Sequence, residues 1–147
     1  MTRRTGKEIE RDVYTLIRQS YLVTGKDGVP GIRGSVYRFG QRPKDSKAED
    51  CVVIFTTATS EQFQQGVVTL NIYVPDIYPK TGVPREDGER CEQIERLAQD
   101  SVDALTADRS NYLFSIERSR AIHTLREEEI GQSYVVVPLS FRHFQSQ

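Results

Sequence analysis

One stretch of the sequence, residues 66–75, alternates between apolar and mixed positions more clearly than any other part of the chain. Side chains alternate between the two faces of a β-strand, so this pattern predicts a strand with one fully aliphatic face. That face carries Val68, Leu70, Ile72 and Val74. Pro75 lacks a backbone donor and is expected to end the strand. We predict an inner strand of a sheet, around which the rest of the chain folds.

Two segments repeat their apolar residues at helical spacing. The first begins at Thr5, whose hydroxyl and the carboxylate of Glu8 three residues later form a capping box. It is expected to run to about Tyr21 and to end before Gly25. The second predicted helix covers residues 91–105, where apolar residues form a stripe. Its first turn has carboxylates, which favour the positive end of a helix.

Four further segments have strand character, namely residues 35–39, 51–57, 112–118 and 133–144. Residues 51–57 are almost continuously apolar and β-branched, which is typical of a strand covered on both faces. They are close enough to residues 67–74 to pair with them as an antiparallel hairpin. Pro138 predicts that part of the last strand lies at an edge or a bulge. Residues 119–131 are compatible with either a bent strand or a loop.

The element order is therefore α–β–β–β–α–β–β, which favours an α+β fold over a parallel α/β fold. We expect a largely antiparallel or mixed sheet of about five strands, with both helices packed on one face. The 147 residues suit a single domain, 1–147. Residues 76–89 contain prolines, glycines and mixed charges and form a long loop. Loops of this length in a compact domain are usually functional or disordered.

Composition narrows the class of protein. Lys and Arg number 20, Asp and Glu 21, and the net charge of −1 argues against a dedicated nucleic-acid-binding protein. Apolar runs are too short for a membrane span, and the N-terminus lacks the apolar segment of a secretory signal. Cys51 and Cys91 fit a reducing compartment as small buried apolar side chains, with a disulfide the less favoured alternative.

Residues that could carry chemistry are scattered. His123 and His143 have no second ligand at metal-binding spacing, so we expect surface or edge histidines rather than a zinc site. The glycine-rich segment 24–34 follows a helix instead of a strand, and it lacks the Gly-Lys-Ser/Thr ending of a phosphate-binding loop. Acidic residues suited to a metal-dependent nuclease are limited to Glu117, Glu127 and Glu128, and solvated surface charge is the favoured interpretation. We predict no enzyme activity, no metal and no cofactor.

Basic residues gather in three places, each interleaved with acidic residues. The clusters are Arg3, Arg4 and Lys7; Arg42, Lys44 and Lys47; and Arg109, Arg118, Arg120 and Arg126. Clustering of this kind is needed for contact with phosphates. Because acidic residues accompany each cluster, solvated surface and ion pairs between subunits are the better interpretation.

The sequence Val-Val-Thr-Leu-Asn-Ile-Tyr-Val-Pro-Asp at residues 67–76 resembles the paired central strands of small tail-completion proteins of tailed phages. The preceding strand, Asp-Cys-Val-Val-Ile-Phe-Thr-Thr at residues 50–57, continues the resemblance. So do the leading helix, the long loop, the helix beginning Arg-Cys-Glu-Gln-Ile-Glu-Arg-Leu-Ala at residue 90, and the two closing strands. The resemblance covers residues 6–144, mainly as an order of elements.

This resemblance implies a tail terminator, a structural protein of a phage or prophage. Such proteins form a ring, commonly hexameric, that caps the tail tube and joins it to the head-tail connector protein. The implied partners are further copies of the chain, the tail tube protein and the connector, with DNA only passing through the ring and no membrane contact. The protein would reside in the virion, and in the host cytoplasm during assembly. Alternatives are a head-completion protein of related fold, or a small nucleic-acid-acting protein, either a nuclease or a regulator.

A ring closes through heterologous contacts, in which one surface meets a different surface of the next copy. We expect the second face of the strand at residues 67–74 and the loop at residues 76–89 to make contacts with other copies or with the tube. The predicted contact residues are Thr69, Asn71, Tyr73, Asp76, Tyr78, Lys80, Arg85 and Glu86. Shortening the loop should leave the monomer folded but impair assembly.

Overall fold

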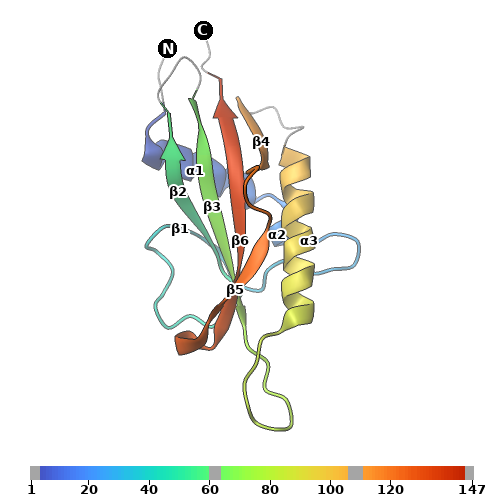
Figure 1. The fold of residues 1–147 in the computed structure, drawn as a ribbon. Coiled ribbons are helices and arrows are strands. Elements are labelled where there is room, and N and C mark those ends of the chain that lie inside the picture. Colours follow the sequence, from blue (N-terminus) through green and yellow to red (C-terminus); the bar gives the residue numbers. More distant parts are fainter. Residues whose placement is uncertain (1–3, 60–63, 106–110, 145–147) are drawn as a thin grey trace.

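A computed structural model describes residues 4–59, 64–105 and 111–144. They form one mixed sheet of six strands with helices packed against it, which confirms the predicted α+β class (Figure 1). The strands are β1 (Val36–Arg38), β2 (Cys51–Ala58), β3 (Gln64–Pro75), β4 (Tyr112–Ile116), β5 (His123–Glu127) and β6 (Gln132–His143). The helices are α1 (Gly6–Ile17), α2 (Tyr21–Thr24) and α3 (Gly88–Leu105), with a 3₁₀ turn, η1, at Glu128–Ile130.

The strand predicted at residues 67–74 is β3, an inner strand paired with β2 on one side and with β6 on the other. Both pairings are antiparallel, and β2 and β3 form the predicted hairpin with a β-bulge between Phe55 and Thr57. The short strand β1 lies parallel to β2 at one edge of the sheet. At the other edge, β4 and β5 follow one another along β6.

The core lies between one face of this sheet and the helices. The aliphatic side chains predicted to point inward from β3, Val68, Leu70, Ile72 and Val74, are at most 1% exposed. They meet the apolar stripes of α1 and α3, which include Ile9, Val13, Ile94 and Val102. Both long helices therefore cover the same face, as the sequence predicted.

The first helix is shorter than predicted. The capping box is present, since Thr5 and Glu8 each accept a hydrogen bond from the other's backbone amide. However, α1 ends at Ile17, and α2 begins after a turn at Ser20. The amide of Leu22 at the start of α2 donates to the Ser101 hydroxyl of α3 at 3.1 Å, so the interrupted chain turns onto the other helix. Leu22 is fully buried there.

Pro138 lies in β6, where it pairs with Thr69 of β3 on one side and falls in the gap between β4 and β5 on the other, so β6 is locally an edge there, as predicted. Its carbonyl accepts a hydrogen bond from the amide of Glu117, just beyond β4, at 2.8 Å. A residue's N–H and C=O point to the same side of a strand, so the missing N–H of Pro138 would also point away from β3. β4 pairs with β6 only up to Leu139, and β5 begins at Val136. The proline therefore removes no hydrogen bond from either pairing.

Two more expectations need correction. The ambiguous segment 119–131 contains β5 and the 3₁₀ turn, so the sheet has six strands rather than about five. The strand β2 was expected to be covered on both faces, but the helices cover only one, and Thr56 on the other face is exposed. Among the described residues, no helix combines the length and the apolar character needed to cross a membrane.

Candidate functional site: the open face of the sheet and a projecting loop

The face of the sheet that points away from the helices is called the open face here. Alternation along the strands and the pairing register place these side chains on it: Val52, Ile54 and Thr56 of β2; Val67, Thr69, Asn71 and Tyr73 of β3; Tyr134, Val136, Pro138 and Ser140 of β6; and Leu113 and Ser115 of β4. The side chains at the centre of this face are uncharged, although 28% of the chain is Asp, Glu, Lys or Arg. Its ends carry charges, since the same register places Arg142 of β6, opposite Leu113, and Glu127 of β5, opposite Gln132, on this side. A sheet face that evolved to face water normally carries charged side chains.

The predicted contact residues of β3 lie on this face. Thr69 is half-buried, and its hydroxyl is 2.8 Å from that of Thr56 on β2. Asn71 is also half-buried, two residues further along the strand. A cross-strand polar pair of this kind stabilises a sheet modestly. It leaves the outer side of both side chains accessible to a partner.

Tyr73 lies at the lower end of the open face under a side chain that the sequence did not predict there. The Arg42 guanidinium is 3.9 Å from the centre of the Tyr73 ring, a distance typical of a cation–π contact. The ring also packs against Tyr134, with 5.6 Å between centroids. Burial raises the pKa of the Tyr73 phenol. The loop before β2 therefore shields this predicted contact residue.

Arg42 is itself fixed by hydrogen bonds from its guanidinium. It donates to the Asp50 carboxylate at 2.9 Å and to the side chain of Gln132 at 3.0 Å. The Asp50 and Gln132 side chains are almost completely buried. Arg42 comes from a loop that is close to β3 in three dimensions but is not adjacent to it in sequence. Strand periodicity therefore could not reveal its contact with Tyr73.

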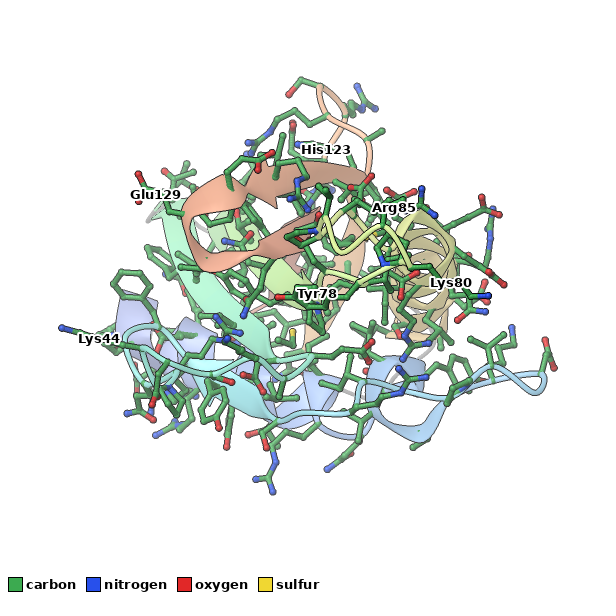
Figure 2. The ribbon with its side chains drawn as sticks, turned by 90° about the horizontal axis from the view of Figure 1, so that it is seen from below. Lys44, Tyr78, Lys80, Arg85, His123 and Glu129 are labelled. Carbon is green, nitrogen blue, oxygen red and sulfur yellow. The ribbon has the colours of Figure 1, made fainter. Side chains whose placement is uncertain are left out.

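The second group of predicted contacts lies on the 76–89 loop, which projects beyond the lower end of the sheet (Figure 1). Seen from below, Tyr78, Lys80 and Arg85 are spread along this loop (Figure 2). Tyr78 is 70% exposed, and Lys80, Arg85 and Glu86 are also exposed. These side chains are accessible in the isolated chain, and their role in contacts stays a prediction.

Asp76 differs from the other predicted contacts because its side chain is only 2% exposed. Its carboxylate binds the Arg126 guanidinium of β5 through two hydrogen bonds, one of them 3.1 Å long. Such a bidentate pair has a well-defined geometry. Asp76 therefore anchors the base of the loop instead of contacting a partner.

The structure brings no catalytic group of residues together in the described part of the chain. No three His, Cys, Asp or Glu side chains gather there in a way that could hold a metal ion. Cys51 and Cys91 are buried free thiols, as predicted, and burial raises the pKa of each to about 12. A thiol with such a pKa is almost entirely protonated near neutral pH and is a poor nucleophile.

The histidines differ from the prediction in one respect. His143 is 7% exposed, so it is a buried residue rather than a surface one. Its ring lies 4.7 Å from that of Tyr112, and its Nδ1 atom is buried without a hydrogen-bond partner in the described structure. Burial and the nearby Arg4 lower the pKa of His143.

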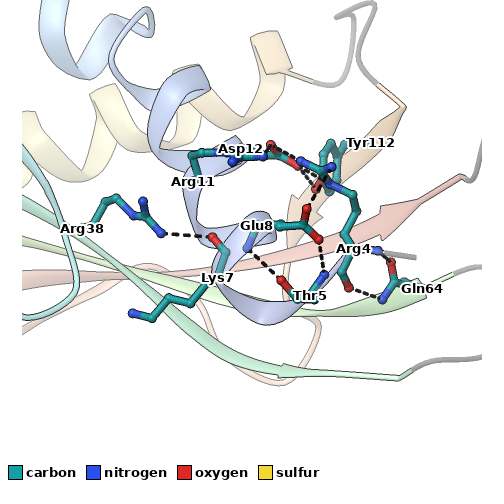
Figure 3. A network of polar contacts seen from close by, with 9 residues as sticks. All are labelled: Arg4, Thr5, Lys7, Glu8, Arg11, Asp12, Arg38, Gln64 and Tyr112. Atoms are coloured by element: carbon teal, nitrogen blue, oxygen red, sulfur yellow. Dashed lines mark hydrogen bonds and ion pairs between the residues drawn. The ribbon is translucent and has the colours of Figure 1, made fainter. Parts of the chain in front are cut away.

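Several arginines from the predicted basic clusters bind carboxylates of their own chain. Arg4 donates to both oxygens of Asp12, at 3.0 and 2.8 Å, beside the hydroxyl of Tyr112 (Figure 3). Arg42 and Arg126 bind Asp50 and Asp76 as described above. Charges neutralised in this way contribute little to phosphate binding, which weakens the nucleic-acid-binding alternative.

One hollow lies outside the predicted sites, between α3, the loop at Lys26–Val29 and the segment before β5. Its volume is about 620 Å³. Lys26 is 3.7 Å from Asp100, and Glu95 accepts a hydrogen bond from Thr124 at 2.7 Å. These charged groups are partly satisfied within the chain and do not converge on a common point.

A comparison with known proteins adds no further indication of function. The sequence matches no protein-family model and no curated protein.

Proposed function

We propose that this protein is a structural subunit of a phage or prophage tail, a tail terminator that assembles into a homo-oligomeric ring. The single observation that carries the proposal is the uncharged centre of the open face, which one side of the sheet presents to solvent in the isolated chain. Its apolar side chains, including Val67, Tyr134 and Leu113, favour burial against protein. The resemblance of residues 6–144 to tail-completion proteins supplies the biological setting.

The size of the open face is adequate for a subunit contact. Strands lie about 4.8 Å apart and rise about 3.3 Å per residue, so four strands of eight residues cover about 500 Å². Together with a projecting loop, this area approaches the roughly 800 Å² per partner of a standard interface. The face is therefore large enough to hold a copy of the chain, and a ring places the same contact at every subunit boundary.

The residues that stabilise the fold differ from those available for assembly, as expected of an assembly protein. The core face and the helices give the monomer its stability, whereas Thr69 and Asn71 contribute little to the core. A substitution at Asn71 can therefore impair assembly without unfolding the subunit. The same separation holds for Tyr78 and Lys80, which are exposed on the projecting loop.

The decisive experiment removes the gene from the phage or prophage and examines lysates by electron microscopy. A tail terminator is expected to leave overlong or unattached tails. Normal tails beside heads that fail to join would indicate the related head-completion role, and normal joined particles would exclude both. Metal-dependent cleavage of DNA by the purified protein would revive the nuclease alternative.

A complementation experiment tests whether the open face is needed for normal tails. Wild-type protein supplied in trans should restore normal tails, whereas Asn71→Lys, which places a charge at the centre of the face, should fail. A matched control is Ala104→Lys, because Ala104 is exposed on α3 in the helical layer. The control should complement fully, and equal thermal unfolding temperatures would show that both variants fold.

A further inference from the structure

The side of α3 that points away from the core carries mainly acidic side chains. Residues three or four positions apart share one side of a helix, and opposite the buried stripe of α3 these are Glu89, Glu92, Arg96, Gln99 and Asp103. The three carboxylates are exposed, and one arginine lies among them. This row is called the acidic stripe here. At 1.5 Å per residue, it is about 21 Å long.

Cations beside the acidic stripe are bound by other carboxylates of the chain. On one flank, the ammonium of Lys26 is 3.7 Å from the carboxylate of Asp100. On the flank next to β5, the guanidinium of Arg120 is 4.0 Å from the carboxylate of Glu117. Each of these cations therefore has its own partner, and the stripe keeps a net negative charge.

The outer side of α1 carries the opposite charge. Lys7, Arg11 and Arg18 are four and seven residues apart, so they lie along one side of the helix and its C-cap. The Lys7 side chain is 70% exposed although it reaches Glu10, a buried carboxylate that Arg38 binds at 2.9 Å. The Arg11 side chain is 53% exposed. This row, about 16 Å long, is called the basic stripe here.

The carboxylates beside the basic stripe are occupied by one arginine. Arg4 is 2.8 Å from the carboxylate of Asp12 and 3.6 Å from that of Glu8 (Figure 3). Arg11 is farther from Asp12, at 4.0 Å. The acidic side chains of α1 are therefore neutralised within the chain, and the exposed charge along this side is positive.

We propose that the acidic stripe of one copy docks on the basic stripe of the next copy. The inference rests on the proposed ring function and names two surfaces that meet at a subunit boundary. Within one chain, α1 packs on the β1–β2 side of the sheet and α3 on the β4–β6 side (Figure 1). The two stripes of a chain therefore point to different sides. Their contact is heterologous and runs head to tail, the arrangement that closes a ring.

The match between the stripes favours a second copy over other partners. They have opposite charge and similar length, and every chain carries one of each. A polyanion such as DNA would satisfy the basic stripe only, and the net charge of the chain is just −1. Exposed ion pairs are individually weak, but complementary charges speed association and orient the partners. The stripes would thus set the orientation of neighbouring copies.

The test uses two charge-reversed variants, each altering one stripe. Glu89→Lys with Glu92→Lys makes the acidic stripe basic, and Arg11→Glu with Arg18→Glu makes the basic stripe acidic. All four side chains are exposed, so the core is left intact, and equal thermal unfolding temperatures would confirm this. Each variant alone brings like charges together at every boundary. Its self-association should weaken by about 100-fold or more, as measured by analytical ultracentrifugation at low salt.

Mixing the two variants tests whether the contact is head to tail. In an alternating assembly, every boundary again joins opposite charges, so a 1:1 mixture should assemble. A single chain with all four substitutions has the wild-type net charge and should assemble alone. Either double variant assembling like the wild type would overturn the inference. So would a mixture or a fourfold variant that stays monomeric.

A control separates the position of the charges from their number. Asp45→Lys with Glu129→Lys changes the net charge as much as the α3 variant does, at exposed sites outside both helices. This control should assemble normally, and its failure would assign the effect to net charge and overturn the inference. If the wild type is monomeric alone, its amide NMR shifts should still move at both stripes as its concentration rises to about 1 mM. Constant shifts would overturn the contact.

Two further outcomes are distinguished by separate measurements. Short duplex DNA that binds the wild type but not the Arg11→Glu, Arg18→Glu variant, in the absence of self-association, would assign the basic stripe to phosphate and overturn the inference. Failure of the proposed function would be seen independently, as normal joined tails in lysates that lack the gene. Charge-dependent association of the purified chain would stand in that case.

Discussion

The guanidinium of Arg90 donates to both carboxylate oxygens of Glu49 at 2.9 Å, and each side chain is 3% exposed. Arg90 lies in the first turn of α3, and Glu49 precedes β2, so the pair joins a helix to the sheet. The same guanidinium also donates to the backbone carbonyls of Pro30 and Gly31, at 3.0 and 2.7 Å. One arginine therefore fixes three segments of the chain.

Removing the charge of only one of these two residues should destabilise the folded protein. Glu49→Gln leaves Arg90 buried with an unpaired charge, and Arg90→Met leaves the carboxylate of Glu49 in the same condition. Each should lower the free energy of unfolding by about 3 kcal/mol or more. The double variant should lose much less than the sum, because no uncompensated charge remains. Urea denaturation measures all three, and simple additivity would show that the pair is not coupled.

The two faces of β3 should respond differently to truncation. Leu70 is fully buried, so Leu70→Ala should cost about 3 kcal/mol of unfolding free energy through lost burial and a cavity. Asn71 is the next residue and points to the open face, so Asn71→Ala should change stability by less than about 0.5 kcal/mol. Thermal and urea unfolding of the two variants test this contrast. A large loss at Asn71 would mean that the open face is needed for folding.

The pair formed by Asp76 and Arg126 should control the order of the hairpin at residues 77–85, which the Ile77–Arg85 bridge closes. Asp76→Asn keeps the size of the side chain but removes its charge, so the bidentate ion pair is lost. We expect faster hydrogen exchange at the amides of Ile77 and Arg85, which form the bridge. Exchange at Leu70 in the core should stay unchanged. Equal protection of the bridge in both proteins would show that the hairpin is stable without its anchor.

His143 should make stability depend on pH. Its pKa in the folded protein is lowered by burial below the ordinary value of 6.5, so the folded state favours the neutral ring. Stability is therefore full above the unfolded pKa and declines as the pH falls through and below 6.5. Arg4, Asp12 and Tyr112 are the charged and titratable groups that surround the ring.

The check compares the wild type with His143→Gln, which cannot take up this proton. The loss of unfolding free energy between about pH 7.5 and pH 5.5 should be smaller in the variant. Carboxylates with lowered pKa, such as Glu8 and Glu117, titrate at still lower pH and affect both proteins alike. An identical pH profile for the two proteins would show that His143 is not the cause.

Local patterns predicted much of the secondary structure because they depend on neighbours in sequence. The alternation in β3, the capping box at Thr5 and the apolar stripe of α3 each follow from backbone periodicity. The break after Ile17 was missed, since it depends on the distant Ser101. A local edge at Pro138 was predicted, but only the register reveals that the gap between β4 and β5 creates it.

Some residues of the candidate site could likewise be predicted from the sequence, and others could not. Thr69 and Asn71 could be placed on one face from the alternation alone, and the exposure of Tyr78 follows from its position in a polar loop. Asp76 could not be recognised as an internal anchor, because its partner Arg126 is distant in sequence.

The sequence by itself determined the class of fold, the aliphatic face of β3, the two helices that cover it and the mixed, uncharged second face of β3. These properties are set by side-chain chemistry repeated at the period of a strand or a helix. Only the tertiary structure decided that β6 lies inside the sheet and that arginines such as Arg42 and Arg126 bind carboxylates of their own chain. Those features depend on contacts between residues far apart in sequence, and periodicity carries no information about such contacts.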